Sequence, residues 1–403
     1  MEYALPCRAS RLPHGSLPQA AGTAQADSPA LADLRLAAAN APTLARAFLD
    51  LHAAYRQTHE RLASLDEALG REDARLQPSP WEEVRDFFHY CDNYIDAVDR
   101  AAERFADQCG VGESKANAAK RVLLAQGVTV DIKPFDALRH YDPANKLLTL
   151  STNTPEATQT FQLLLQMALL TQEPLIEATL DLARFGSPEA RAIAKVGLAN
   201  YFAGAALMPY GAFLQAAQDT RHDLEILATR FGASLEQVAH RLSTLQRTGA
   251  KGIPFFFVRV DQAGTITKRH SATTLQFARY GGACPLWNVH AAFETPGQFL
   301  RQLAETPDGA RYFCLARDVS KSGGAFNAPM RRYAIGLGCE VRHADALVYA
   351  DHMDRAAPSA YSPIGISCRI CERRNCHQRS VPPIERRLRV DPNARGVLPY
   401  QVD

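Results

Sequence analysis

The chain has 403 residues, of which 46% are hydrophobic and 22% are charged, and its formal net charge is +2 at pH 7. This length exceeds what one hydrophobic core normally holds, so two or three domains are expected in an ordinary soluble globular protein. No apolar run approaches the roughly 18–20 residues of a membrane-spanning helix, which excludes an integral membrane protein. The small net charge says little about binding partners.

The N-terminal composition and the cysteines indicate the compartment. Residues 1–29 are rich in Ala, Pro, Gly and Ser, without a basic segment followed by an apolar core. They predict a disordered leader and not a secretory signal. The nine cysteines have no regular spacing outside the C-terminal segment, which favours a reducing environment. We therefore expect a cytoplasmic protein.

Helical periodicity dominates the next part of the chain. Apolar residues from Leu34 to Leu62 recur at a heptad-like spacing, which predicts a helical segment over 30–70. Residues 71–80 are polar and carry prolines, as is typical of a linker. Ser79 and Pro80, followed by acidic residues, predict a capped helix start. The apolar residues of this helix continue to Phe105.

Three short strands and then five helices are predicted up to residue 249, and a different pattern follows. The strands are expected at 127–132, 137–141 and 146–151, and the helices at 155–170, 176–183, 188–207, 223–230 and 235–246. Beyond a boundary near residue 249, strands are expected at 253–260, 265–270, 312–317 and 332–337, and a helix at 295–304. The predicted fold class is α+β: a mostly helical half with a small sheet, then a mixed antiparallel α/β unit with a cysteine-containing tail.

Three cysteines lie close together near the C-terminus. Cys368, Cys371 and Cys376 have the spacing C-x2-C-x4-C and are surrounded by arginines. Thiolates bind zinc or the iron of an iron–sulfur cluster, and cationic neighbours favour the ligating thiolate. The alternative is three unrelated thiols in a surface tail. The pattern predicts a metal centre, either iron–sulfur or zinc.

A second group of polar and cationic residues lies in the segment 262–286. Paired glycines allow a ligand to approach the backbone, lysine and arginine suit phosphate, and a tryptophan can stack on a flat group. A charged hairpin with a core tryptophan explains the same pattern equally well. The candidate ligand-binding residues are Lys268, Arg269, His270, Ser271, Arg279, Tyr280 and Trp287.

Other functional motifs are weak. The segment Leu224–Leu242 has the sequence pattern of a helix-turn-helix, with Gly232 at the turn. Glu236 at the start of its second helix opposes DNA phosphate, so a structural helical hairpin is favoured over a DNA reader. The sequence contains no His-Glu-x-x-His motif, no Walker loop and no Gly-x-Ser-x-Gly elbow. His270 and His290 are interpreted as structural.

Residues from about 30 to 390 resemble the short-chain fatty acyl-responsive transcriptional regulators of bacteria. The resemblance rests on stretches that occur in family order, namely Trp81–Phe88, Gly197–Tyr210, Phe231–Gln246, Pro254–Asp261, Gly282–Asn288, Ile335–Cys339 and Pro363–Glu372. It implies a DNA-binding helix-turn-helix, then an ImmA/IrrE metallopeptidase-like domain, then a ligand-sensing domain. Here these would be a degenerate peptidase-like domain over 79–249 and an acyl-CoA-sensing domain over 250–403.

The sequence departs from the family pattern at two places. Where the peptidase motif supplies zinc-binding histidines, a glutamate base and a third ligand, this chain has Leu165, Gln166, Leu169 and Leu198. These side chains cannot bind zinc or activate water, so no enzyme activity is expected. The N-terminal DNA-binding domain is also expected to be missing. DNA binding would then need an upstream helix-turn-helix or the segment Leu224–Leu242.

The resemblance implies a function and its cofactors. We expect a sensor of short-chain acyl-CoA, for example in propionate metabolism, that binds acyl-CoA through the Lys268–Trp287 region. It implies a cluster, [4Fe-4S], on Cys368, Cys371 and Cys376, with Cys339 or His377 as the fourth ligand, or else zinc. The helical segment 30–70 is expected to form a homodimer or a higher homo-oligomer. The alternative functions are a zinc-binding structural or regulatory protein and a metallopeptidase.

Overall fold

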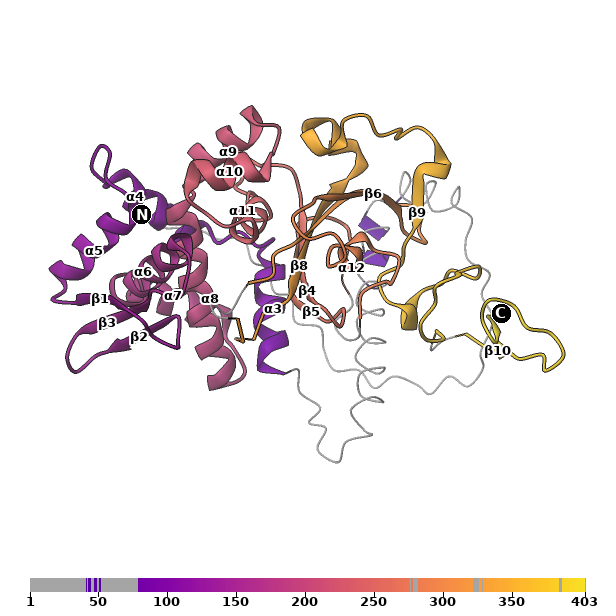
Figure 1. Cartoon of the computed structure of the whole chain (residues 1–403), viewed down its shortest axis with the longest axis horizontal. Helices are drawn as coiled ribbons and strands as arrows, with labels where there is room; N and C mark the ends of the chain where they lie inside the picture. The colour runs from indigo at the N-terminus through magenta and orange to yellow at the C-terminus, as the bar shows by residue number, and fades with distance from the viewer. Residues whose placement is uncertain are drawn as a thin grey trace. The chain divides into compact units, whose positions relative to one another are not determined.

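The computed structural model describes residues 79–402, except 276, 278–281, 322–325, 328 and 384–385 (Figure 1). It also describes scattered positions between 41 and 51. The chain divides into two compact units, residues 1–59 and 60–403, and the second unit is described below. The predicted leader 1–29 lies outside the described residues. The predicted segment 30–70 also lies outside them, apart from those scattered positions.

The first part of the described chain is mainly helical. Its elements are α3 (Pro80–Tyr90), α4 (Asp96–Asp107), α5 (Lys115–Ala125), β1 (Thr129–Lys133), β2 (Arg139–Asp142), β3 (Leu147–Ser151), α6 (Glu156–Thr171), α7 (Glu173–Ala183), α8 (Pro188–Leu207), α9 (Tyr210–Asp219), α10 (Leu224–Phe231) and α11 (Leu235–Leu242). β3 is the central strand of a three-stranded sheet, parallel to β1 and antiparallel to β2. The long helix α8 packs against α3, α4, α6 and α7.

Local sequence signals set the ends of several helices. Ser79 caps α3 by accepting a hydrogen bond from the Glu82 amide at 3.3 Å, with Pro80 in the first turn. The helix predicted to continue to Phe105 is instead two helices, α3 and α4. The backbone turns between them at Asp92 and Asn93, with φ of 50° and 56°. Aspartate and asparagine tolerate this left-handed conformation better than most residues, so they end the first helix.

The second part is built around a six-stranded sheet with the order β5-β4-β8-β7-β6-β9. Its elements are β4 (Phe256–Asp261), β5 (Ile266–Ser271), α12 (Asn288–Ala291), β6 (Leu300–Glu305), β7 (Arg311–Asp318), β8 (Tyr333–Glu340), β9 (Tyr361–Pro363) and the short 3-10 helices η1 (Val341–Ala346), η2 (Val348–Ala350), η3 (Pro358–Ala360) and η4 (Cys368–Ile370). A separate pair joins β10 (Leu388–Arg389) to β11 (Gln401–Val402). The α+β fold class is confirmed.

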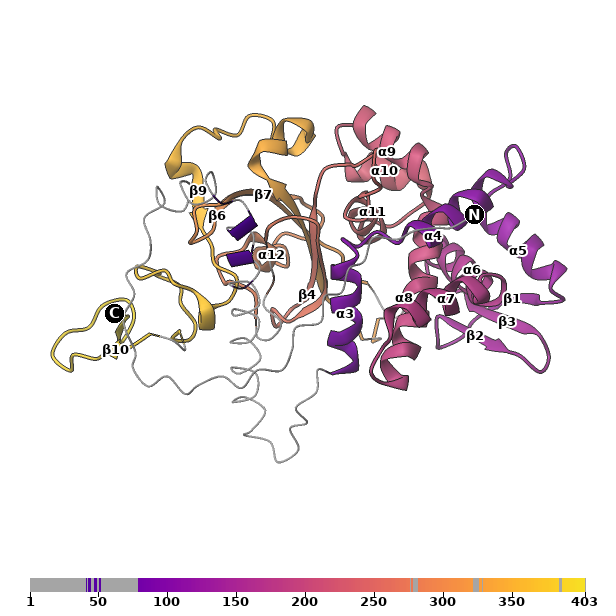
Figure 2. The same cartoon turned by 180° about the vertical axis from the view of Figure 1, so that it is seen from behind.

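Alternate residues of the large sheet enter two different hydrophobic cores. Phe257 and Leu337 belong to the core shared with the helices, whereas Phe256 and Val258 belong to a second core. The second core also contains Trp287, just before α12, and Val289, within α12. Figures 1 and 2 both show α3 between the helical part and this sheet, beside the edge strand β5. Ile364, just after β9, belongs to the second core and Ile366 packs against it, so the region that contains the cysteines adjoins this face of the sheet.

The predicted helix over 295–304 was wrong. The chain forms a turn at Gly297, where φ is 82°, and then the strand β6, which pairs antiparallel with β7. Adjacent residues Leu303 and Ala304 enter opposite cores, as strand geometry requires. Pairing with β7 overrides the helix-compatible spacing of the apolar residues. None of the described helices is long and apolar enough to cross a membrane.

Candidate metal centre

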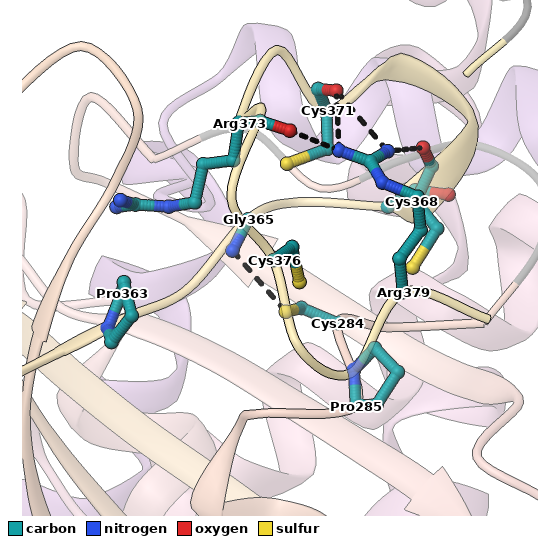
Figure 3. Close-up of a pocket in the computed structure, with 10 residues that line it drawn as sticks. Cys284, Pro285, Pro363, Gly365, Cys368, Cys371, Arg373, Cys376 and Arg379 are labelled. Carbon is teal, nitrogen blue, oxygen red and sulfur yellow. Dashed lines mark hydrogen bonds between the residues drawn. The ribbon is translucent and has the colours of Figure 1, made fainter. Parts of the chain in front are cut away.

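Four cysteine thiols line one cavity in the C-terminal part of the chain (Figure 3). Three of them belong to the predicted cluster Cys368, Cys371 and Cys376, and the fourth is Cys284 from the loop before α12. The cavity has an empty volume of about 270 Å³, and its other lining residues are Pro285, Pro363, Gly365, Ser367, Arg373 and Arg379. Two segments that are distant in sequence thus bring their sulfur atoms to one place.

Tight turns place these cysteines. The Cys371 amide donates to the Cys368 carbonyl at 3.4 Å, which folds the C-x2-C segment into the single turn η4. On the other side, the Trp287 amide donates to the Cys284 carbonyl at 3.0 Å. Gly365 permits the close approach, since a β-carbon there would lie 2.9 Å from the Cys371 sulfur. The conformation of the loop therefore depends on this glycine.

Backbone amides also point at two of the sulfur atoms. The Gly365 amide lies 3.2 Å from the Cys284 sulfur, and the Ser380 amide lies 3.4 Å from the Cys368 sulfur. Burial raises the pKa of Cys284, as do Cys368 and Cys371, while the amides of Gly365 and Leu286 act in the opposite direction. Amide hydrogen bonds to sulfur stabilise a thiolate, and a bound metal deprotonates a thiol outright. The donor set therefore fits a thiolate-bound metal centre.

The two predicted alternatives for the fourth ligand are not among the lining residues. Cys339 lies on β8 within the core shared with the helices, and burial raises its pKa. His377 is exposed. In the described part of the chain, no three His, Cys, Asp or Glu side chains already converge as the ligands of a single metal ion. Cys284 is better placed than either alternative to complete a set of four.

The predicted ligand-binding residues are not assembled into one site. Lys268 pairs with Glu236 at 2.8 Å, and Arg269 pairs with Glu82 at 2.7 Å. His270 packs against His240, with ring centroids 4.6 Å apart. Ser271 bonds within its own loop, donating to the Leu275 carbonyl at 2.8 Å, and Trp287 is buried in the second core. Arg279 and Tyr280 lie outside the described residues.

Lys268 nevertheless belongs to a group with excess positive charge. Glu236 on α11 is approached by Arg259 at 2.9 Å, Lys268 at 2.8 Å and Lys321 at 4.0 Å. Burial alone would raise the pKa of Glu236, but Lys268, Arg259 and Lys321 together lower it to about 2. One carboxylate thus faces three cations. Glu236 is turned toward the sheet, in keeping with a structural role for the pair α10–α11, whose turn is made at Gly232 with φ of 60°.

A small apolar cavity lies on the same face of the sheet. Its empty volume, which includes space open to solvent, is about 220 Å³, and it is lined by His222, Leu224, Phe255, Phe313, Leu315, Leu337, Gly338, Leu347 and Tyr349. Phe255 and Arg259 are four residues apart, so they lie on the same side of the β4 segment, about 13 Å apart by strand geometry. In the wall of this cavity, the Tyr349 hydroxyl already accepts a hydrogen bond from the Leu224 amide at 2.9 Å.

The four positions at which the sequence analysis expected peptidase ligands belong to the interior of the helical part. Leu165 and Leu198 are buried in the main core, and Leu169 packs against it. The Gln166 side chain accepts a hydrogen bond from Arg139 at 2.8 Å. Leucine side chains have no lone pair for a metal, and a glutamine amide is not a base. These residues pack α6 against α8 and the small sheet.

Two family models match the chain in tandem. The IrrE N-terminal-like domain matches residues 126–243, and the C-terminal domain of the short-chain fatty acyl coenzyme A regulators matches residues 244–400. A propionyl-CoA carboxylase regulator from Cereibacter sphaeroides is 71% identical over 93% of this chain and 81% of its own length. The chain belongs to the short-chain fatty acyl coenzyme A regulator family.

Other members of this regulator family are also similar. The HTH-type transcriptional regulators RamB and PrpR of Mycobacterium tuberculosis are 41% and 44% identical, covering 90% and 80% of this chain and 78% and 68% of their own lengths. The solved structure of a Mycobacterium tuberculosis transcriptional regulator has a TM-score of 0.76 and 43% identity, covering 80% of this chain and all of that one. The domain boundary near residue 249 remains a prediction, although the two family matches meet at residues 243 and 244.

Cys284 is the site residue that the sequence analysis missed. It lies in the run Gly281-Gly-Ala-Cys-Pro285, whose glycines were interpreted as part of a ligand site, whereas its thiol was given no role. It precedes Cys368 by more than eighty residues, so spacing gives no sign that the two meet. The sequence did indicate that a fourth ligand was needed, because a cluster bound by only three neighbouring thiols is incomplete.

Proposed function

We propose that this protein is the ligand-sensing part of a transcriptional regulator of short-chain acyl-CoA metabolism, such as that of propionate, acting in the cytoplasm. The observation that carries the proposal is its membership of a regulator family whose sensing domain matches residues 244–400. The relatives are named as regulators, and the degenerate peptidase positions support a sensor without enzyme activity. Acyl-CoA would bind more tightly to one of two states of the protein and so change its interaction with DNA.

The proposed acyl-CoA site uses the helix-facing side of the large sheet. Lys268 and Lys321 are 45% and 44% exposed, and the single carboxylate of Glu236 only partly neutralises the three cations around it, so the two lysines are available to phosphate groups. The apolar cavity beside Phe255 would take the short acyl chain. Arg259, which shares Glu236 with these lysines, lies about 13 Å along the strand from Phe255 in the cavity wall. Lys268 is therefore retained from the predicted ligand residues, whereas Arg269 is engaged by Glu82.

The proposed cofactor is an iron–sulfur cluster held by Cys368, Cys371, Cys376 and Cys284. The fit rests on four thiols around one cavity, amides directed at two sulfur atoms, and a wall that carries arginines. A [4Fe-4S] cluster requires four such ligands and would make the segment sensitive to redox state; zinc would supply a structural crosslink instead. The homodimer through residues 30–70 remains a proposal outside the described residues. DNA binding also remains a proposal, through an upstream helix-turn-helix or through the segment Leu224–Leu242.

Thermal unfolding with a panel of acyl-CoA esters tests the sensing function. Acetyl-, propionyl- and butyryl-CoA should raise the unfolding temperature, and the shift should grow with the logarithm of ligand concentration, since a ligand specific for the folded state stabilises it. Free CoA and a long-chain acyl-CoA are the controls. No shift with any short-chain ester would overturn the sensing proposal. Metal analysis of anaerobically prepared protein tests the cofactor separately: iron and sulfide indicate a cluster, and zinc alone contradicts it.

A further inference from the structure

Arg379 places a positive charge in the wall of the thiol cavity. Its side chain is 5% exposed and lines the cavity together with the four cysteines (Figure 3). A guanidinium remains charged in proteins at any physiological pH. Arg379 is therefore a buried cation beside a group of thiols.

Every hydrogen-bond acceptor of this guanidinium is a backbone carbonyl. Nη1 donates to the Cys368 carbonyl at 3.0 Å and approaches the Cys371 carbonyl at 3.4 Å. Nη2 donates to the Cys371 and Arg373 carbonyls, and Nε has no partner. Arg379 thus holds the backbone of two of the four cysteines. Carbonyl dipoles solvate the cation but do not neutralise it.

Within the part of the chain that the structure describes, no acidic side chain lines the cavity to balance this charge. The charged lining residues are Arg373 and Arg379, and among the described residues no carboxylate forms an ion pair with either of them. A buried charge without a counter-charge is strongly destabilising. The anionic groups available to balance it are the cysteines themselves, as metal-bound thiolates.

We infer that Arg379 couples the charge of the thiol-bound metal centre to the order of the C-terminal segment 365–380. This inference rests on the proposed metal centre. Four thiolates around a zinc ion or a [4Fe-4S] cluster form a net anion, which balances the guanidinium. Without the metal, the metal–thiolate anion that balances the guanidinium is no longer assembled. Arg379 is then an uncompensated buried cation, so it moves to solvent and releases the carbonyls of Cys368 and Cys371.

Substitutions that separate the charge of Arg379 from its hydrogen bonds test this inference. The full chain is prepared anaerobically as wild type, Arg379→Lys, Arg379→Gln and the control Arg374→Gln, which changes an exposed arginine of the same segment. Metal loss to a competing chelator and hydrogen exchange of residues 365–380 are measured. We expect Arg379→Gln to bind the metal about tenfold more weakly, as is typical for residues that support metal ligands. Arg379→Lys and Arg374→Gln should stay close to wild type.

Hydrogen exchange gives the second readout. In wild type, segment 365–380 should exchange slowly with metal bound and rapidly after metal removal, and Arg379→Gln should exchange rapidly in both states. Equal metal loss in the Lys and Gln variants would overturn the role of charge and leave a hydrogen-bonding role alone. Unchanged metal retention in Arg379→Gln would overturn the coupling itself. Wild-type protein that contains no metal would instead refute the proposed metal centre, and this inference with it.

Discussion

The sulfur of Cys371 lies 2.9 Å from the point where a β-carbon on residue 365 would stand. Real β-carbons do not approach other atoms so closely, so the thiol occupies space that only glycine leaves free. We predict that Gly365→Ala displaces the Cys371 sulfur and weakens metal retention at least tenfold. Gly396→Ala is the matched control, because its β-carbon would lie 3.7 Å from the nearest atom. Metal content after gel filtration checks the prediction, and full retention in Gly365→Ala would contradict it.

The assignment of Cys284 as the fourth ligand can be separated from the alternatives. Cys284→Ser should lose the metal as fully as Cys371→Ser, because both thiols line the same cavity. Cys339→Ser should retain the metal, since Cys339 is buried on β8 in the other core. His377→Ala should also retain it. Metal analysis and visible absorption spectra of the four variants decide between them, and loss in Cys339→Ser with retention in Cys284→Ser would reverse the assignment.

Local sequence signals were sufficient for most of the fold. The cap at Ser79, the turn at Gly232 and the paired strands around residues 261–264 each depend on residues adjacent in sequence. The predicted helix over 295–304 failed because β6 is specified by its partner β7, which no local pattern reveals. The break between α3 and α4 was missed because Asp92 and Asn93 look like ordinary polar residues until the backbone is seen.

The site was only partly predictable for a related reason. The spacing of Cys368, Cys371 and Cys376 places three thiols close together in sequence, but Cys284 is brought to them by the tertiary packing of a distant loop. The basic run Lys268–His270 looked like a phosphate site in sequence. In the structure its charges are divided between Glu236 and Glu82, and His270 is packed among aromatic rings. Charge partners that are distant in sequence decide which cations remain available.

Breaking a buried ionic network should strongly destabilise the helical part. Asp99 is fully buried and accepts from Arg241 at 2.6 Å, Arg247 at 3.1 Å and the Tyr201 hydroxyl at 2.8 Å. We predict that Asp99→Asn lowers the free energy of unfolding by about 3–5 kcal/mol, because both guanidiniums lose their shared anion. Asp96→Asn, at an exposed ion pair with Arg100, should change it by less than about 1 kcal/mol. Urea denaturation measures both, and similar effects for the two variants would contradict the prediction.

Stability should fall in mild acid because of the paired histidines. Burial lowers the pKa of His240 to about 3; Lys268 and Arg241 lower it too, while Glu236 opposes them. Burial, and then His240, lower the pKa of His270. Both rings are neutral in the folded protein, so the unfolded chain binds more protons below its ordinary histidine pKa of about 6.5. The contribution of the neutral histidine rings to the free energy of unfolding is complete above that pH and is lost as the pH falls toward about 3.

We expect His240 to account for at most about 2 kcal/mol between pH 7 and pH 5, from the linkage of protonation to folding. His240→Gln cannot titrate and should show a shallower fall in the urea midpoint over that range. His377→Gln, at an exposed histidine, is the control and should follow wild type. A variant His240→Gln with the same pH slope as wild type would show that the ring is accessible to protons in the folded state.

Lys268 should contribute to acyl-CoA binding without being required for folding. Its loss leaves Arg259 and Lys321 to neutralise Glu236, so Lys268→Ala should fold normally. A charged hydrogen bond to phosphate contributes about 1.5–3 kcal/mol, so propionyl-CoA should bind roughly tenfold more weakly or worse. Lys251→Ala, at an exposed lysine of the same family-matched region, should bind as wild type does. Calorimetric titration at two salt concentrations measures this, since a phosphate contact also weakens with salt. Equal affinity in Lys268→Ala and wild type would place the CoA phosphates elsewhere on the protein.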